Sequence, residues 1–262
     1  MTHPLEIEID DRGVATVTMT DTDRHNALSE PMMDALSDMA ATVGQNPDVR
    51  AVILTGAGKS FCAGGDLAWM RAQFEKGEAA KEAAARKLAD MLQALDRMPK
   101  PLIGRINGQA FGGGLGLMSI CDVAIGLSGS KFGFTETRLG LTPATISPYV
   151  VARMGAAKAR RVFMSARLFD GDEAVRLNLL TEAVDDLAIL DQRVQHEVEP
   201  YLSCAPGAVA DAKALIHALS RQIDDAVIAH TVAALSERWA DSEAQEGINA
   251  FFDRRKPQWN KG

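Results

Sequence analysis

The chain has 262 residues, of which 47% are hydrophobic and 24% charged, and its formal net charge is −7. This composition is typical of a globular protein and excludes the collagen-like, low-complexity and disordered classes. The acidic balance argues against a dominantly basic nucleic-acid-binding protein, although it leaves room for a local basic patch. The longest stretch without a charged residue, 106–121, is shorter than the roughly 20 apolar residues that a membrane helix needs.

The spacing of the cysteines and the N-terminal residues predict the cellular compartment of the protein. Cys62, Cys121 and Cys204 are widely separated and form no CxxC pair, which favours a reducing compartment, and we expect the cytoplasm. Residues 1–10 show no positive leader followed by an apolar run, so no secretory signal is expected. The five histidines form no ligand cluster, and we expect no metal site.

The first 126 residues alternate between segments typical of strands and of helices, which predicts an α/β protein with largely parallel strand pairing. We expect a β-hairpin over 5–20, a helix over 29–43 with Ser29 as its N-cap, strands over 51–55, 102–106 and 123–126, and helices over 78–97 and 115–121.

From about residue 155 the pattern is almost continuously helical, and strand-like alternation ends with residues 179–184. No long Pro/Gly/Ser-rich linker interrupts the chain, so we expect one compact unit. The predicted helical segments are 156–164, 171–178, 191–198, 208–219 and 241–252.

Three motifs that would indicate other chemistry fail on spacing. The segment 56–60, GAGKS, resembles the end of a phosphate-binding loop, but position 53, where that loop needs glycine, is isoleucine. The run 112–116 lacks the third glycine of a dinucleotide fingerprint. The nucleophile-elbow pattern fails because Ser130 stands at its last glycine position.

Two glycine-containing turns remain, over 61–67 and 110–114, each after an expected strand and before an expected helix. A helix N-terminus presents unpaired N–H groups, and glycine lets a ligand approach them closely. Two such turns together would form a cradle for an oxygen that gains negative charge during a reaction. Tight turns required only for strand–helix packing are the alternative.

Four segments in order, FCAGGDL, NGQAFGGGLGL, CDVAIG and FGFTETRLGL, resemble the crotonase (enoyl-CoA hydratase/isomerase) superfamily. The resemblance extends from the loop at His25 to the tail AFFDRRKPQW. It implies an α/β fold with a ββα spiral core over residues 1–195. A helical region over 196–262 would then serve oligomerisation and cover the pocket. It also implies an acyl-CoA thioester as substrate, no metal or redox cofactor, and a homotrimer or dimer of trimers.

The resemblance assigns roles by motif position. Gly65 and Gly113 would donate the two oxyanion-hole hydrogen bonds to the thioester carbonyl. Ala27 and Leu28 could equally form a hydrophobic staple at a helix start. The positions matched to the CoA site are Arg24, Ala27, Leu28, Ala63, Gly64, Asp66 and Leu67.

The expected acid/base group is Glu136, the glutamate of the FGxxE segment. Hydratases of the superfamily commonly carry a second glutamate, and this chain has Gly116 at that position. We expect one carboxylate to handle both proton transfers, with a pKa raised towards neutrality by burial. An ion pair with Arg138 or Arg153, or a helix cap, is the structural alternative for Glu136.

The segments around Trp69 and ETRLGLTPATISPYVV look most like bacterial hydratases of branched, carboxylated enoyl-CoAs, the 3-methylglutaconyl-CoA and isohexenylglutaconyl-CoA hydratases. Arg138 and the segment 142–147 are candidate partners for such a distal carboxylate. The basic cluster 254–256 could meet CoA phosphates, or it could be a solvated chain end. Residues 248–252 fit a packed or an interfacial helix.

The alternatives for function are double-bond isomerisation, which also suits one carboxylate, and a catalytically quiet member that binds acyl-CoA or RNA. Because nucleic-acid backbone contacts depend on clustered Lys and Arg, the acidic net charge makes RNA an unlikely partner.

Overall fold

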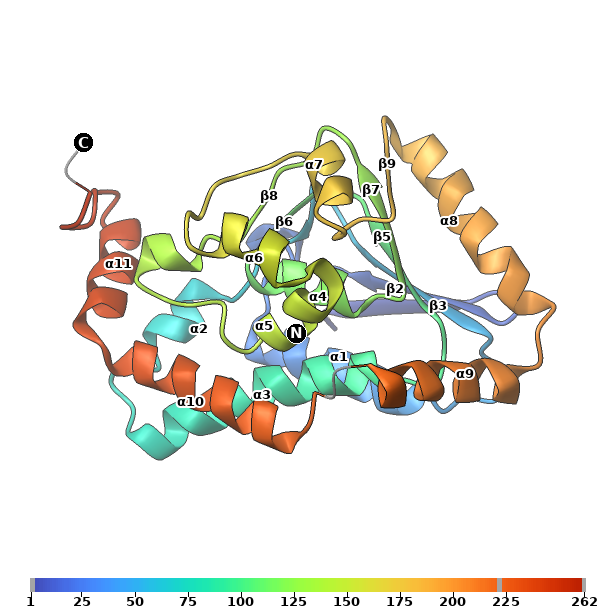
Figure 1. Ribbon diagram of the computed structural model, residues 1–262, viewed down its shortest axis with the longest axis horizontal. Coiled ribbons are helices and arrows are strands. Elements are labelled where there is room, and N and C mark those ends of the chain that lie inside the picture. The colour runs from blue at the N-terminus through green and yellow to red at the C-terminus, as the bar shows by residue number, and fades with distance from the viewer. Residues whose placement is uncertain (1–2, 221–222, 261–262) are drawn as a thin grey trace.

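The structure, a computed structural model, describes residues 3–220 and 223–260 (Figure 1). The strands are β1 (Leu5–Ile9), β2 (Val14–Met19), β3 (Ala51–Gly56), β4 (Ser60–Cys62), β5 (Leu102–Ile106), β6 (Gln109–Phe111), β7 (Val123–Leu127), β8 (Phe132–Gly133) and β9 (Glu182–Val184). The helices are α1 (Glu30–Thr42), α2 (Leu67–Arg71), α3 (Glu78–Asp96), α4 (Gly113–Ile120), α5 (Ser147–Met154), α6 (Ala156–Phe163), α7 (Gly171–Arg176), α8 (Leu187–Leu202), α9 (Pro206–Leu219), α10 (Asp225–Ala240) and α11 (Ser242–Phe252), with 3-10 helices η1 (Thr22–Arg24) and η2 (Glu136–Leu139).

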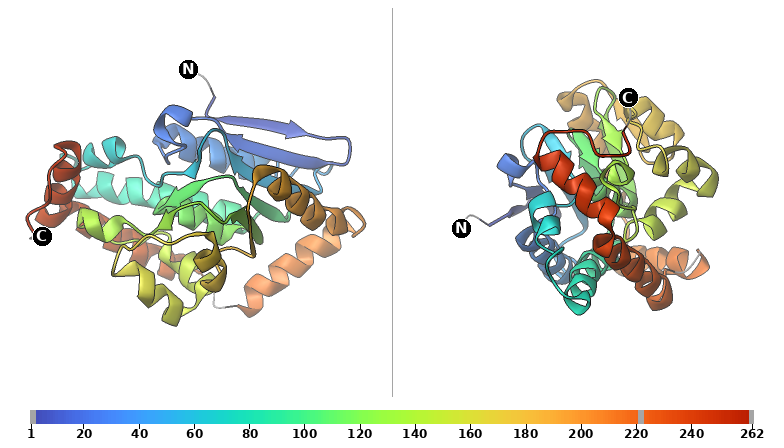
Figure 2. Two further views of the ribbon diagram at one scale, coloured as in Figure 1. Left: turned by 90° about the horizontal axis from the view of Figure 1, so that it is seen from above. Right: turned by 90° about the vertical axis from the view of Figure 1, so that its left-hand side faces the viewer.

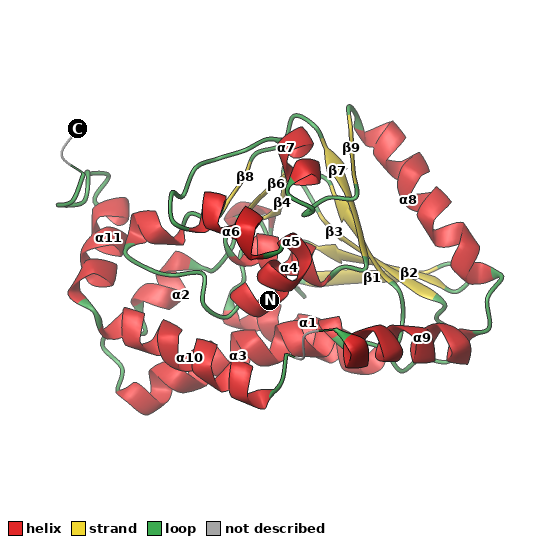
Figure 3. Cartoon of the chain, viewed as in Figure 1, coloured by secondary structure: helices red, strands yellow, loops and turns green. Residues whose placement is uncertain are grey.

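The protein contains two sheets, and helices pack around them except at the hairpin β1–β2, which lies at one edge of the molecule (Figures 2 and 3). The larger sheet has the order β1-β2-β3-β5-β7-β9; β1 pairs antiparallel with β2, and the remaining pairs are parallel. The smaller sheet, β4-β6-β8, is parallel. Strands β3, β5 and β7 of the large sheet are each followed by a strand of the small sheet and then by helix, which is the ββα spiral.

The glycine turns follow the small sheet, not the strands of the large sheet as expected. The first turn leaves β4 and enters α2, and the second leaves β6 and enters α4. Because β4 and β6 are hydrogen-bonded neighbours, Ser60 pairing with Gln109 and Cys62 with Ala110, their carboxyl ends lie side by side. The small sheet therefore brings the two turns together.

Apolar side chains bury the large sheet on both faces, as parallel sheets require. Helix α8 covers one face through a cluster that includes Ile53, Ile125 and Leu190, while helices α1, α3, α4 and α5 contribute to the main core on the other. A third cluster joins α3 to α10 and α11 around the buried Trp239. Helices α8 and α11 lie at opposite ends of the molecule (Figures 1 and 2).

The sequence predicted most of these elements correctly. Ser29 caps α1 by accepting a hydrogen bond from the amide of Met32 at 3.4 Å. Sequence reasoning did not single out α10 or the small-sheet strands. The division at residues 195–196, which lies within α8, stays a prediction. Within the described residues, no helix is both long and apolar enough to cross a bilayer.

Candidate active site

A cavity of about 770 Å³ opens where the two glycine turns meet η2 and the C-terminal helices. All ten residues that the sequence predicted for the site line this cavity: Arg24, Ala27, Leu28, Ala63, Gly64, Gly65, Asp66, Leu67, Gly113 and Glu136.

The first turn points one main-chain N–H away from the protein's own acceptors. The amide of Leu28 donates to the carbonyl of Gly64 at 2.7 Å, and the amide of Asp66 donates to the carbonyl of Leu28 at 3.4 Å. Because C=O and N–H of a trans peptide point in opposite directions, fixing the Gly64 carbonyl towards Leu28 turns the Gly65 N–H the other way. Within the described residues the Gly65 N–H has no acceptor.

The second turn ends in the first residue of α4, Gly113, whose N–H also lacks an acceptor in the described chain, as expected at a helix start. The turns are in close contact: a Cβ on Gly64 would lie 3.4 Å from the amide nitrogen of Gly113 and 2.7 Å from the carbonyl oxygen of Phe111. Gly64 also has a φ of +94°, which side chains other than glycine rarely adopt. Two unpaired amides thus lie at one wall of the cavity.

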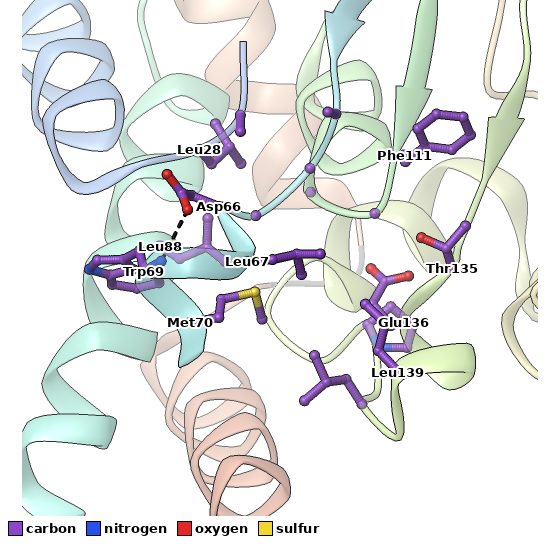
Figure 4. Close-up of a pocket in the computed structure, with 18 of the residues that line it drawn as sticks. Leu28, Asp66, Leu67, Trp69, Met70, Leu88, Phe111, Thr135, Glu136 and Leu139 are labelled. Carbon is purple, nitrogen blue, oxygen red and sulfur yellow. Dashed lines mark hydrogen bonds between the residues drawn. The ribbon is translucent and has the colours of Figure 1, made fainter. Parts of the chain in front are cut away.

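Glu136 places a carboxyl beside these amides. A Cβ on Gly112 would lie 3.0 Å from its Oε1, and Figure 4 shows Glu136 across the cavity from Leu67 and Met70 of α2. Its Oε2 is inaccessible to solvent and has no hydrogen-bond partner among the described residues. Burial raises the pKa of Glu136 to about 7, an effect that the residue's own amide partly opposes. The carboxyl can therefore both accept and return a proton near neutral pH.

The ion-pair alternatives for Glu136 are absent from the described structure. Arg153 donates to the main-chain carbonyls of Cys121, Asn178 and Leu179. Arg138 is exposed and lines the cavity, and its guanidinium has no carboxylate or carbonyl partner among the described residues.

Apolar atoms occupy the space where a side chain at position 116 would project. A Cβ on Gly116 would lie 2.5 Å from Cγ2 of Ile146 and 3.7 Å from Cδ2 of Leu92. Ile146 itself lines the cavity and is 2% exposed. A branched aliphatic side chain thus fills the space beside Gly116.

A charged pair, Arg24 and Asp66, lines the cavity. Arg24 contacts Asp66 (Nη1 to Oδ2, 3.2 Å) and Asp21 (Nε to Oδ2, 2.9 Å), so two carboxylates already compensate its charge. Asp66 is 8% exposed and caps α2 by accepting from the Trp69 amide at 3.0 Å (Figure 4). Both residues line the cavity, but their side chains already form ion pairs and hydrogen bonds within the protein.

Several cavity residues were not found from the sequence. Sδ of Met70 lies 2.9 Å from where a Cβ on Gly65 would stand. Trp69 meets Trp239 of α10 edge to face, with ring centroids 5.8 Å apart. Trp69 and Met70 directly follow the motif and could have been suspected, whereas nothing in the local pattern marks Trp239 as a neighbour of α2.

The C-terminal helix α11 contributes aromatic side chains to the cavity. Phe251 and Phe252, which the sequence placed in a packed or interfacial helix, line the cavity and are 57% and 39% exposed. In the basic cluster, Arg255 forms two hydrogen bonds to the carboxylate of Glu246, at 2.6 and 2.8 Å. Within the described chain, no three His, Cys, Asp or Glu side chains are placed to hold a metal ion.

Solved structures share this fold. An enoyl-CoA hydratase from Shewanella pealeana superimposes with a TM-score of 0.80 at 36% identity, covering 98% of this chain and 96% of that one. In sequence, the chain is 30% identical to the short-chain-enoyl-CoA hydratase of Clostridium acetobutylicum over 93% of its length and 92% of the relative. It is also 30% identical to the crotonyl-CoA hydratase of Syntrophomonas wolfei, with 88% of each chain covered.

This chain is therefore an α/β protein with the crotonase fold. The chain belongs to the enoyl-CoA hydratase/isomerase family, whose pattern it matches over residues 10–262.

Proposed function

We propose that this enzyme adds water to the double bond of a 2-enoyl-CoA thioester. The observation that carries the proposal concerns three polar groups that have no hydrogen-bond partner among the described residues. Oε2 of Glu136 is inaccessible to solvent, and it lines a cavity in which the amides of Gly65 and Gly113 come close together. The hydratase names of the relatives in Clostridium acetobutylicum and Syntrophomonas wolfei support the same activity.

In the proposed mechanism the amides of Gly65 and Gly113 hydrogen-bond the thioester oxygen and stabilise the enolate that forms as the π bond breaks. Glu136 accepts a proton from water while the water oxygen bonds to C3. The same carboxyl then delivers that proton to C2, and the carbonyl reforms. Water supplies both the hydroxyl and the hydrogen, so the reaction needs no cofactor besides the CoA part of the substrate.

The acyl group is proposed to be branched and to carry a distal carboxylate, as in 3-methylglutaconyl-CoA or isohexenylglutaconyl-CoA. Besides the sequence resemblance, Arg138 supports this: it lines the cavity, its guanidinium has no partner among the described residues, and a desolvated carboxylate needs a cationic or N–H partner. Arg138→Ala should raise KM about tenfold for a carboxylated enoyl-CoA and leave KM for crotonyl-CoA within twofold. Arg160→Ala, an exposed arginine outside the cavity, is the control. Equal effects on both substrates would contradict the role of Arg138.

The CoA part is proposed to lie along residues 24–28 and 63–67 at the cavity mouth, and the enzyme to form a homotrimer or a dimer of trimers. Helix α9, all of whose residues are described, buries none of its side chains and exposes Leu215, Ile216 and Leu219. Such a face is typical of a surface covered by another subunit. Light scattering measures the mass directly, and a monomer at micromolar concentration would contradict the assembly.

Loss of enoyl-thioester absorbance, together with the product mass, tests the activity. A product heavier by one water supports hydration. A product of unchanged mass with a shifted double bond supports isomerisation, which the apolar filling at Gly116 and Ile146 also suits. Glu136→Gln should retain less than about a tenth of the turnover, given the 10²–10⁴-fold usually contributed by acid/base groups.

A further inference from the structure

Three main-chain hydrogen bonds join the loop 24–28 to the turn 63–66. The amide of Ala63 donates to the carbonyl of His25 at 3.0 Å, and Leu28 forms the two main-chain bonds to Gly64 and Asp66 described above. The ion pair between Arg24 and Asp66 adds a side-chain contact between the same two segments.

These bonds differ in strength along the turn. At 2.7 Å the bond that holds the Gly64 carbonyl is short, whereas at 3.4 Å the bond from the Asp66 amide is long and weak. The peptide group whose N–H faces the cavity lies immediately before this weak bond. The side chain of Asp66 contacts both sides of the turn: Oδ2 binds Arg24 of the loop, and Oδ1 binds the first turn of α2.

We propose that Arg24 and Asp66 are positioning residues for the oxyanion hole: their ion pair holds the loop 24–28 against the turn 63–66 and fixes the direction of the Gly65 N–H. This inference rests on the proposed function, because it assigns the pair to the transition state of that reaction. It differs from the expectation that both residues act chiefly by binding CoA.

The two roles predict opposite kinetics. A donor aimed at developing negative charge acts mainly in the transition state, so misdirecting it lowers kcat while KM changes little. A residue that holds the CoA part binds ground state and transition state alike, so removing it raises KM and leaves kcat unchanged. The charge of Arg24, compensated by Asp21 and Asp66, favours the first role.

The test uses Asp66→Ala, Asp66→Asn, Arg24→Ala and the double variant, with kcat and KM measured for crotonyl-CoA. Losing a whole oxyanion donor costs about 10²–10³ in rate, so a misdirected one should lower kcat about 10–100-fold in Asp66→Ala, with KM within about threefold. Asp66→Asn should recover part of kcat, since asparagine also caps helices. The double variant should be no worse than Asp66→Ala, because both residues act through one contact. Arg193→Ala, which breaks the surface pair with Glu182, is the matched control and should change neither constant.

A binding assay separates this inference from the hydratase proposal. Acetoacetyl-CoA forms an enolate that absorbs in the near ultraviolet, and an oxyanion hole increases the bound fraction of that enolate without any turnover. The wild type should show this absorbance, and Asp66→Ala and Arg24→Ala should lose most of it while still binding the ligand.

Unchanged kcat and enolate absorbance with a tenfold higher KM in Asp66→Ala would overturn the inference. So would a loss in the Arg193 variant equal to that in the Arg24 variant. If the wild type forms the enolate but hydrates no enoyl-CoA, the hydratase proposal fails while the positioning role is still decided by the absorbance of the variants. Thermal melts identify an unfolded variant, and Asp66→Asn, which keeps the cap, then decides the result.

Discussion

Replacing Glu136 by glutamine should lower turnover to less than about a tenth and at the same time stabilise the protein at alkaline pH relative to acidic pH. Glutamine has nearly the shape of glutamate and carries no charge at any pH. Oε2 of the carboxyl that it replaces is inaccessible to solvent and has no partner among the described residues, and this desolvation raises the pKa from 4.5 to about 7.

The magnitude follows from this difference in pKa. Below pH 4.5 Glu136 is protonated in both the folded and the unfolded state, so its burial adds no pH dependence. Between pH 4.5 and 7 the unfolded chain loses the proton first, and the free energy of unfolding falls as pH rises. At about 1.4 kcal/mol per pH unit, the cost approaches about 3 kcal/mol above pH 7. Roughly 2–3 kcal/mol of it develops between pH 5 and 8.5.

Urea unfolding of both proteins at pH 5 and pH 8.5, at one fixed protein concentration, measures this cost. The stability of Glu136→Gln relative to wild type should increase by roughly 2–3 kcal/mol between the two pH values, because any effect of the amide itself is the same at both. The kcat of the wild type should rise with pH around an apparent pKa near 7, because the proposed base acts when ionised. A stability difference that is the same at both pH values would refute the assigned burial of this carboxyl.

Further substitutions test the packing of the turns. Gly64→Ala should lower stability by about 2–4 kcal/mol and remove most activity, because its Cβ would lie 2.7 Å from the Phe111 carbonyl oxygen at a φ of +94°. Gly207→Ala is the control: no atom lies within 4 Å of its Cβ, so it should be neutral or slightly stabilising. Equal melting temperatures of the two variants would contradict the steric argument. Gly116→Ala should cost about 1–3 kcal/mol through the 2.5 Å approach to Ile146. In the Ile146→Ala background the same substitution should cost less than 1 kcal/mol, and an undiminished cost in chemical denaturation would show that another contact is responsible.

The sequence predicted the parts of this fold that repeat a pattern over several residues. The hairpin 5–20 alternates apolar and polar side chains, and Ser29 stands where an N-cap belongs. The strands of the small sheet have two or three residues, too few for a period to be visible, so the turns were expected directly after the large sheet.

At the candidate site, the motifs predicted which residues line the cavity but not which contacts their side chains form. The pairing of Arg24 with Asp66, and the filling of the space at Gly116 by Ile146, depend on contacts between distant segments, which one sequence does not reveal. The catalytic and CoA-binding roles of the site residues stay predictions until variants are measured.

The contact between Gly116 and Ile146 also limits how this site could be redesigned. A version with two carboxylates lies at least two substitutions away, and the order of those substitutions matters. Shortening Ile146 first leaves a void, which a folded protein tolerates at some loss of stability, whereas introducing glutamate at position 116 first would force atoms into a filled space. Directed evolution towards the two-glutamate chemistry should therefore begin in the segment before α5, not in the glycine run itself.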